Sequence, residues 1–418
     1  MTRTLLGGFC LVSILVSLSS CKSEDIVCNL ENDVVRQYMS HGPYEYFGSR
    51  ESYFRDREEF PVLYAQDDPR YVDISWPGSP HRSYAVTVKE GGRTVYEGEV
   101  QDTVAHVQNL IPQRKYTFTV KDARRTVRHG TIRTEGQVRM LNIDESCNVR
   151  DLGGWTGLGG KKVRYGWLYR CGSIDGTYTG ISGEVCKGPD RCDDPNHDAA
   201  QDQVGNTAYY TLSDASLKQI SDAGIRAELD LRGTTGIGAW GRQCMSHSRS
   251  LGHSQVPGID FVSIMTDEAL FDPLGYPAVV RDVQWIIDEL KKGNPVAFHC
   301  RSGADRTGAV AFTIEALLGV SSGDIARDYE LTTLSSEGKG QVRDARSTIE
   351  HGYIFFGQGP TTLEVTDAEK TSVLQRQAYR YLNCYFDDAR ISADDLDYLI
   401  DFMLEAHIAR SLRPQWAI

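Results

Sequence analysis

One cysteine and one arginine with five residues between them are the most chemically informative pair in the chain. They are Cys300 and Arg306 in His-Cys-Arg-Ser-Gly-Ala-Asp-Arg-Thr-Gly, residues 299–308. Backbone N–H groups of a glycine-containing loop and of a helix start can point at a bound anion, and a guanidinium can hold two of its oxygens. The same positive field lowers the pKa of a thiol towards the thiolate. The segment therefore predicts a nucleophile, Cys300, inside an oxyanion site.

Two elements flank this segment and would position it. Pro295-Val296-Ala297-Phe298 is a short apolar run, which indicates a buried strand. Residues 309–318 are mostly apolar and helix-forming, and Gly319 closes them. We therefore expect Cys300 at the end of a strand and Arg306 at the start of a helix.

Three further motifs precede the loop in a fixed order, and they are Asn148-Val149-Arg150-Asp151-Leu152-Gly153-Gly154, Tyr165-Gly166-Trp167-Leu168-Tyr169-Arg170 and Leu229-Asp230-Leu231-Arg232. Together with the loop they resemble the bacterial tyrosine phosphatase family, whose loop usually has the sequence His-Cys-x-x-Gly-Lys-Asp-Arg-Thr-Gly. The resemblance spans roughly residues 141–400. It implies an α/β phosphatase domain with a sheet flanked by helices.

The chain departs from the family pattern at two places. Ala304 stands where the family commonly has lysine, so one positive charge near the phosphate is missing, and Arg301 could replace it from another angle. Residues 233–238 follow Arg232 where the family has a glutamate. The reaction type is therefore better defined than the substrate.

The resemblance and the chemistry assign roles within the loop. Cys300 would attack phosphorus to give a phosphocysteine, which water then hydrolyses. Arg306 would bind two equatorial oxygens as charge spreads in the transition state. His299 is expected to orient the loop, and Thr307 could donate its hydroxyl to the departing thiolate or cap the helix. The expected substrate-binding residues are Arg301, Ser302, Gly303, Ala304 and Thr307.

The general acid has more than one candidate. A leaving phenolate or alkoxide needs a proton from a carboxylic acid within reach of the bridging oxygen. The family resemblance implies Asp305, beside Arg306. More distant cysteine phosphatases carry the acid on a separate loop, and Asp267 lies 33 residues before Cys300 (300 − 267) in a suitable place. Asp272 is a weaker alternative.

Charged residues of the earlier motifs have two possible uses. They could pair with one another and brace the loop, or some could contact the substrate, and the residues concerned are Arg150, Asp151, Arg170, Asp230 and Arg232.

The first twenty residues have the pattern of an export signal. Arg3 precedes an apolar stretch, and Leu18-Ser19-Ser20-Cys21 resembles a bacterial lipoprotein cleavage site. We therefore expect lipidation of Cys21 and a membrane as a partner, with the protein on the cell envelope. A transmembrane anchor is the alternative, although the apolar run is short and broken by serines.

Composition and cysteine spacing exclude several functions. The formal net charge is −12, which argues against a nucleic-acid partner. No Cys-x-x-Cys or His-x-x-x-His spacing suggests zinc, and we expect neither a metal nor a cofactor. Asp194, Asn196 and Asp198 alternate like calcium ligands, but the glycine and glutamate of a calcium loop are missing. Export permits disulfides, and Cys186–Cys192 is the closest candidate pair.

The chain divides into four parts. Residues 1–20 are the signal, 21–61 a spacer that packs in part on the domain after it, and 62–136 a set of short alternating strands. This strand pattern, with Trp76 and Leu110-Ile111-Pro112, resembles an all-β fibronectin type III sandwich. Residues 141–418 form the expected catalytic domain, with an insertion at about 174–210.

Taken together, the sequence predicts an exported, lipid-anchored phosphatase that hydrolyses phosphate monoesters, with phosphotyrosine in a peptide or another small phosphomonoester as the first choice. Hydrolysis of phosphoinositides or inositol phosphates is a second hypothesis. A third, from a different class, is an inactive anion-binding or adhesion protein.

Overall fold

A computed structural model describes residues 23–42, 71–123, 125–174, 177–179, 185–186, 210–232, 253–266, 276–335, 367–383 and 390–405. Contacts divide the chain into two compact units. One takes its described residues from Met1–Ile26, Ile74–Ala105 and Lys115–Ile132, and the other from Val27–Asp73, His106–Arg114 and Arg133–Ile418.

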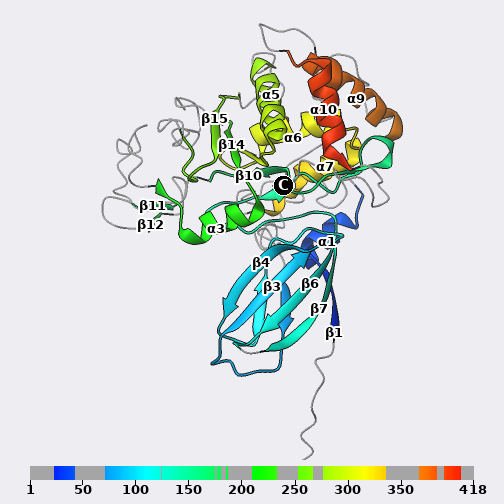
Figure 1. Ribbon diagram of the computed structural model, residues 1–418. Helices are drawn as coiled ribbons and strands as arrows, with labels where there is room; N and C mark the ends of the chain where they lie inside the picture. The colour runs from blue at the N-terminus through cyan, green and yellow to red at the C-terminus, as the bar shows by residue number, and fades with distance from the viewer. Residues whose placement is uncertain are drawn as a thin grey trace, which may run out of the picture. The chain divides into compact units, whose positions relative to one another are not determined.

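The β-rich unit is built on a five-stranded sheet in the order β1-β7-β6-β3-β4 (Figure 1). The strands are β1 (Ser23–Asn29), β3 (Tyr84–Glu90), β4 (Arg93–Val100), β6 (Lys115–Lys121) and β7 (Thr126–Glu135). A separate pair joins β2 (Val72–Ser75) to β5 (Val104–Val107). Buried residues alternate along β3 and β6 because successive side chains of a strand point to opposite faces. Strands β2 to β7 lie within residues 62–136, where the sequence predicts short alternating strands.

The second unit contains a mixed sheet in the order β15-β14-β16-β10-β8. Its strands are β8 (Arg150–Asp151), β10 (Leu168–Cys171), β14 (Ala227–Asp230), β15 (Asp260–Ser263) and β16 (Val296–His299). The central strand β16 runs parallel to both neighbours, β10 and β14, and β8 is antiparallel at the edge. All residues of β10, β14 and β16 are buried, as expected for strands covered on both faces.

Helices cover both faces of this sheet. One core joins apolar residues of the sheet to α5 (Tyr276–Lys292), α6 (Asp305–Leu317), α7 (Ser322–Leu331), α9 (Asp367–Asn383) and α10 (Ala393–Met403). A second core, on the other face, joins Tyr169 and Ala297 to α3 (Asp214–Ala223). Figure 1 shows α5, α6 and α10 on one side of β10 and α3 on the other. The result is a mixed α/β fold, as predicted.

Capping residues explain where several helices start and stop. Ser213 accepts a hydrogen bond from the Ser216 amide at the start of α3, and Gly224 closes that helix with a φ of 82°. Ser392 caps α10 in the same way by accepting from the Asp395 amide.

Two helices were not predicted from the sequence. The short helix α1 (Asp33–Met39) belongs to the same unit as the mixed sheet, and its Val35 and Tyr38 are buried in the larger core. The helix α9 packs on α6 and α7 and contributes Leu374 and Leu382 to that core. In α9, charged and polar residues separate apolar positions that keep a helical spacing.

Smaller elements complete the described part of the chain. Three short strands, β11 (Thr177–Thr179), β12 (Val185–Cys186) and β13 (Tyr210–Thr211), form a sheet in the predicted insertion. Another pair joins β9 (Lys162–Val163) to β17 (Leu404–Glu405), and two 3-10 turns are Leu158–Gly160 and Thr332–Leu334. Residues 1–22, including the expected export signal and Cys21, lie outside the described residues, as do Cys192, Asp194, Asn196 and Asp198. Among the helices that the structure describes, none is long and apolar enough to span a bilayer.

Candidate active site

The catalytic loop lies at the carboxyl end of the central strand. It begins at Cys300, directly after β16, and ends where α6 begins at Asp305. This edge of a parallel sheet is where α/β proteins usually bind their ligands. Cys300 is only 4% exposed, because β10 and β14 flank its strand and the surrounding side chains belong to the core. The strand and helix predicted on either side of the cysteine are both present.

The path of the loop depends on Gly303. Its φ is 66°, a left-handed conformation that favours glycine, and a Cβ atom there would lie 2.4 Å from the carbonyl oxygen of Cys171. The loop therefore runs against the end of β10 more closely than any side chain would allow. A backbone hydrogen bond also joins the loop to the chain after β10, since the Ser173 amide donates to the Arg301 carbonyl at 2.8 Å.

Arg306 and Thr307 favour the thiolate form of Cys300. Burial alone would raise the pKa of the thiol, and the nearby Asp305 carboxylate acts in the same direction. The positive charge of Arg306 and the adjacent hydroxyl and backbone N–H of Thr307 outweigh both effects, so the pKa of Cys300 lies below its ordinary value. Arg306 is itself 7% exposed, with its guanidinium 3.5 Å from the Leu231 carbonyl oxygen.

A loop-bracing network, consisting of Asn148, Arg150, Arg170 and Asp328, holds the loop through its carbonyl groups. The Asn148 amide donates to the carbonyls of Ser302 and Gly303 at 3.0 and 3.1 Å. Arg170 donates to the Gly303 carbonyl at 2.9 Å. Because the carbonyl groups are bound from this side, the amides of the same peptides can be directed towards an anion.

Asp328 pairs with both arginines of this network. Its carboxylate accepts from Arg150 Nε at 2.9 Å and pairs with Arg170, while its backbone carbonyl accepts from Arg150 at 2.6 Å. Burial and the adjacent Arg170 charge lower the pKa of Arg150 to about 10. The same two arginines overcome the effect of burial on Asp328 and hold the pKa of its carboxyl below the usual range. All three side chains are essentially inaccessible to solvent, so the charge of each depends strongly on the other two.

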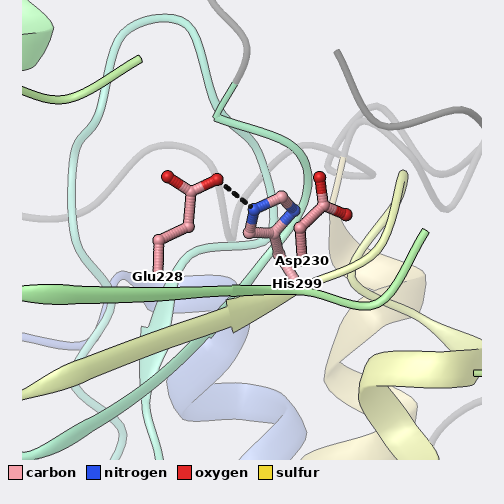
Figure 2. A group of neighbouring side chains, drawn as sticks. All are labelled: Glu228, Asp230 and His299. Atoms are coloured by element: carbon pink, nitrogen blue, oxygen red, sulfur yellow. Dashed lines mark hydrogen bonds and ion pairs between the residues drawn. The ribbon is translucent and has the colours of Figure 1, made fainter. Parts of the chain in front are cut away.

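A strand network, consisting of Glu228, Asp230, Arg232 and His299, lies on the other side of Cys300. Figure 2 shows the Glu228 carboxylate bonded to the His299 ring, with Oε1 and Nε2 3.0 Å apart, and Asp230 beside the same ring. The second ring nitrogen lies 3.1 Å from the Cys300 carbonyl oxygen. Burial would lower the pKa of His299, but Asp230 and the hydrogen-bonded Glu228 raise it to about 9. At neutral pH the histidine is therefore a cation placed directly before the nucleophile.

The strand network also has the spacing of a metal site. Glu228, Asp230 and His299 each offer a ligand atom, and these atoms lie within 4.8 Å of one another. Both oxygens of Asp230 accept from Arg232 at 2.9 Å, and the second oxygen of Glu228 accepts from Ser254. Each atom that could ligate a metal is thus already hydrogen-bonded to another group of the protein. A protonated histidine cannot ligate a cation, so the cluster fits an internal ion-pair network better than a metal centre.

The predicted site residues divide into those that meet at the loop and those that do not. Asp305 begins α6, is partly buried, and accepts a hydrogen bond from the Tyr329 hydroxyl at 3.1 Å. Arg301 and Ser302 are partly exposed, while Gly303, Ala304 and Thr307 are buried. Asp267 and Asp272 fall outside the described residues. Among the charged residues of the earlier motifs, Asp151 pairs with Arg139 at 2.9 Å rather than with the loop.

Sequence reasoning missed three side chains at this site. Glu228 precedes the Leu-Asp-Leu-Arg motif by one position, while Asp328 and Tyr329 lie in α7. An alternation signal could have found Glu228, because residues 228 and 230 point to one face of a strand. No local signal indicates that Asp328 meets Arg150, which is 178 residues away.

Fold and site together define a phosphatase-like domain. A model of the tyrosine phosphatase family matches residues 141–180 and 206–405. The chain belongs to this family, and its membership supports a phosphatase function. A search of curated proteins found no match.

Proposed function

We propose that this protein is a cysteine-dependent phosphatase that hydrolyses phosphate monoesters, with phosphotyrosine in a peptide as the preferred substrate. The observation that carries the proposal is the environment of Cys300, whose thiol has a lowered pKa beside the buried guanidinium of Arg306. A thiolate is the reactive form of cysteine, and a positively charged cradle is what a phosphate dianion needs. Family membership points in the same direction.

The reaction would proceed in two steps. The Cys300 sulfur attacks phosphorus and the P–O ester bond breaks, while Asp305 donates its proton to the leaving oxygen, releasing the alcohol or phenol. Water then attacks phosphorus, its proton passes to Asp305, and the P–S bond breaks to release inorganic phosphate and the thiolate. Arg306 and the loop amides stabilise the equatorial oxygens in both transition states. Arg301, Ser302, Gly303, Ala304 and Thr307 would surround the phosphate.

Other parts of the proposal concern where the enzyme works. An export signal in residues 1–20 and a lipidated Cys21 would anchor the protein to a membrane of the cell envelope. The strands between 71 and 135 would form a fibronectin type III-like module ahead of the catalytic domain. With a formal net charge of −12, no nucleic-acid partner is proposed.

Hydrolysis of p-nitrophenyl phosphate tests the proposal directly. Wild-type protein should release p-nitrophenolate, and Cys300→Ser should lose this activity because the serine hydroxyl is not ionised at neutral pH. Cys28→Ser is the matched control, since Cys28 is a partly exposed cysteine of β1. Equal activity of wild-type protein and Cys300→Ser would contradict the mechanism.

A substrate panel separates the three functional hypotheses. Phosphotyrosine peptides should be hydrolysed with a higher kcat/KM than inositol phosphates or phosphoinositides. The missing lysine at Ala304 supports this order, because it leaves less positive charge for a polyphosphate. The reverse order would favour the inositol phosphate hypothesis, and no turnover of any phosphomonoester would favour an inactive anion-binding protein.

A further inference from the structure

Tyr329 makes a direct contact with the proposed general acid. Its hydroxyl donates to the Asp305 carboxylate at 3.1 Å, from the neighbouring helix α7. Tyr329 is 8% exposed and Asp305 is partly buried, so this hydrogen bond is partly protected from competing water. Asp305 lies in the first turn of α6, where its short side chain could otherwise turn towards the amides of its own helix.

The position of the Tyr329 ring is set by its packing against α6. A Cβ atom on Gly308 would lie 2.9 and 3.1 Å from two ring carbons of Tyr329. Gly308 is three residues after Asp305, so the two lie on the same face of the helix. The glycine therefore leaves the space that lets the ring approach and its hydroxyl reach the carboxylate.

The helix that carries Tyr329 is itself fixed on both sides. The preceding residue, Asp328, pairs with Arg150 and Arg170 of the loop-bracing network. On another side, the Tyr38 hydroxyl donates to the Arg327 carbonyl at 3.0 Å and to Glu330 at 3.1 Å. The helix that pairs with the arginines of the loop-bracing network thus also carries the hydroxyl that contacts the acid.

A phenol is a suitable partner for a group that must gain and lose a proton in each cycle. The neutral hydroxyl of tyrosine can donate to the carboxylate and can accept from the carboxylic acid. It therefore fixes the orientation of the carboxyl group in both protonation states.

We propose that Tyr329 is a positioning residue that orients the Asp305 carboxyl group for proton transfer to the leaving oxygen. This inference rests on the proposed function. Proton transfer requires the acid to lie within hydrogen-bonding distance of the bridging oxygen, and a small misplacement costs much of its effect. Removing the Tyr329 hydroxyl leaves the residues of the phosphate cradle unchanged. The loss should therefore depend on how much the leaving group of each substrate needs a proton.

The test compares aryl phosphates with poor and good leaving groups. It uses kcat/KM because this ratio reports only the steps up to and including cleavage of the ester bond. Tyr329→Phe should reduce kcat/KM for phenyl phosphate by about tenfold and for 2,4-dinitrophenyl phosphate by less than about twofold, since general acid catalysis is worth roughly 10²–10⁴ in total. Asp305→Asn should show the same selectivity with a larger loss. In the double variant, Tyr329→Phe should add almost nothing, because it acts through Asp305.

Two further variants separate positioning from general destabilisation. Tyr38→Phe removes a hydroxyl that binds α7 at Arg327 and Glu330. It should reduce kcat/KM for both substrates equally or not at all. Gly308→Ala keeps the tyrosine but displaces its ring, and it should reproduce the selective loss. Melting temperatures show whether each variant is folded. If Tyr329→Phe does not fold, Gly308→Ala still tests the inference.

The outcomes distinguish the role of Tyr329 from the proposed function. An equal loss for both aryl phosphates in Tyr329→Phe and Gly308→Ala, with a selective loss in Asp305→Asn, overturns the role of Tyr329 alone. An additional tenfold loss when Tyr329→Phe is added to Asp305→Asn also overturns it. Inactive wild-type protein overturns the proposed function, and the inference with it.

Discussion

Two buried charge networks flank Cys300, and they are organised differently. The strand network (Glu228, Asp230, Arg232 and His299) joins side chains of the adjacent strands β14 and β16, where Asp230 and His299 are partners in register. The loop-bracing network (Asn148, Arg150, Arg170 and Asp328) joins residues up to 180 positions apart (328 − 148). The first network binds the histidine before the nucleophile, whereas the second binds the backbone carbonyls after it.

This difference separates two requirements of a phosphate-binding loop. The backbone of the loop must be held in one conformation, which needs donors that reach its carbonyl groups from the side away from the anion. The electrostatic field at the sulfur must also be set, and the charge of Arg306 with the polar groups of Thr307 does this at Cys300. The loop-bracing network serves the first requirement, whereas the strand network holds His299, the residue before Cys300.

Removing the charge of Asp328 should have the largest effect. Asp328→Asn leaves two buried guanidinium groups without their shared carboxylate, and loss of one partner from a buried pair costs about 3–5 kcal/mol. The free energy of unfolding should fall by that amount, and kcat should fall with it because the loop carbonyls lose a fixed support. Urea unfolding and p-nitrophenyl phosphate turnover measure the two effects.

Asp324→Asn on the same helix is the control for this change. Asp324 pairs with Arg327 at 2.8 Å in a partly exposed position, so its loss should cost less than about 1 kcal/mol. Equal destabilisation by both substitutions would contradict the central role of Asp328.

An alanine at Gly303 should have the second largest effect. The substitution combines an unfavourable backbone conformation with a Cβ 2.4 Å from the Cys171 carbonyl oxygen, and together these should cost about 2–4 kcal/mol. Gly159→Ala has a nearly equal φ of 64° but no atom within 4 Å of the new Cβ. The difference between the two variants in unfolding free energy and in kcat/KM therefore isolates the close approach of the loop to β10. No difference between them would show that the approach is unimportant.

The sequence predicts local features of this molecule well. Cys300 and Arg306 are separated by five residues, so the strand, loop and helix that carry them are contained in one continuous segment. Caps such as Ser213 and Gly224 are equally local, because their signal lies within four residues of the helix end. Features of this kind depend on the chain's own neighbours and can be derived before any tertiary contact is known.

Long-range partners could not be predicted in the same way. Asp328 and Tyr329 acquire their roles only when α7 packs beside α6 and the loop, and nothing in their sequence neighbourhood distinguishes them from surface residues. The helix α9 is a different case. Its buried Leu374, Ala378, Tyr381 and Leu382 have helical spacing, so periodicity would have predicted it despite the charged residues between them.

The smallest expected effect belongs to the strand network and depends on pH. The pKa of His299 is raised from 6.5 to about 9, so the histidine stabilises the folded state fully below about pH 6.5, and this contribution is lost as the pH rises through about 9. Glu228→Gln replaces an ion pair by a neutral hydrogen bond and should cost about 1–2 kcal/mol at about pH 6. Because His299 becomes neutral at high pH, the difference from wild-type protein should shrink towards pH 10. Ser254→Ala, which removes the other hydrogen bond to Glu228, should give a cost that does not follow this titration. A pH-independent difference for Glu228→Gln would mean that His299 is not held as a cation by this network.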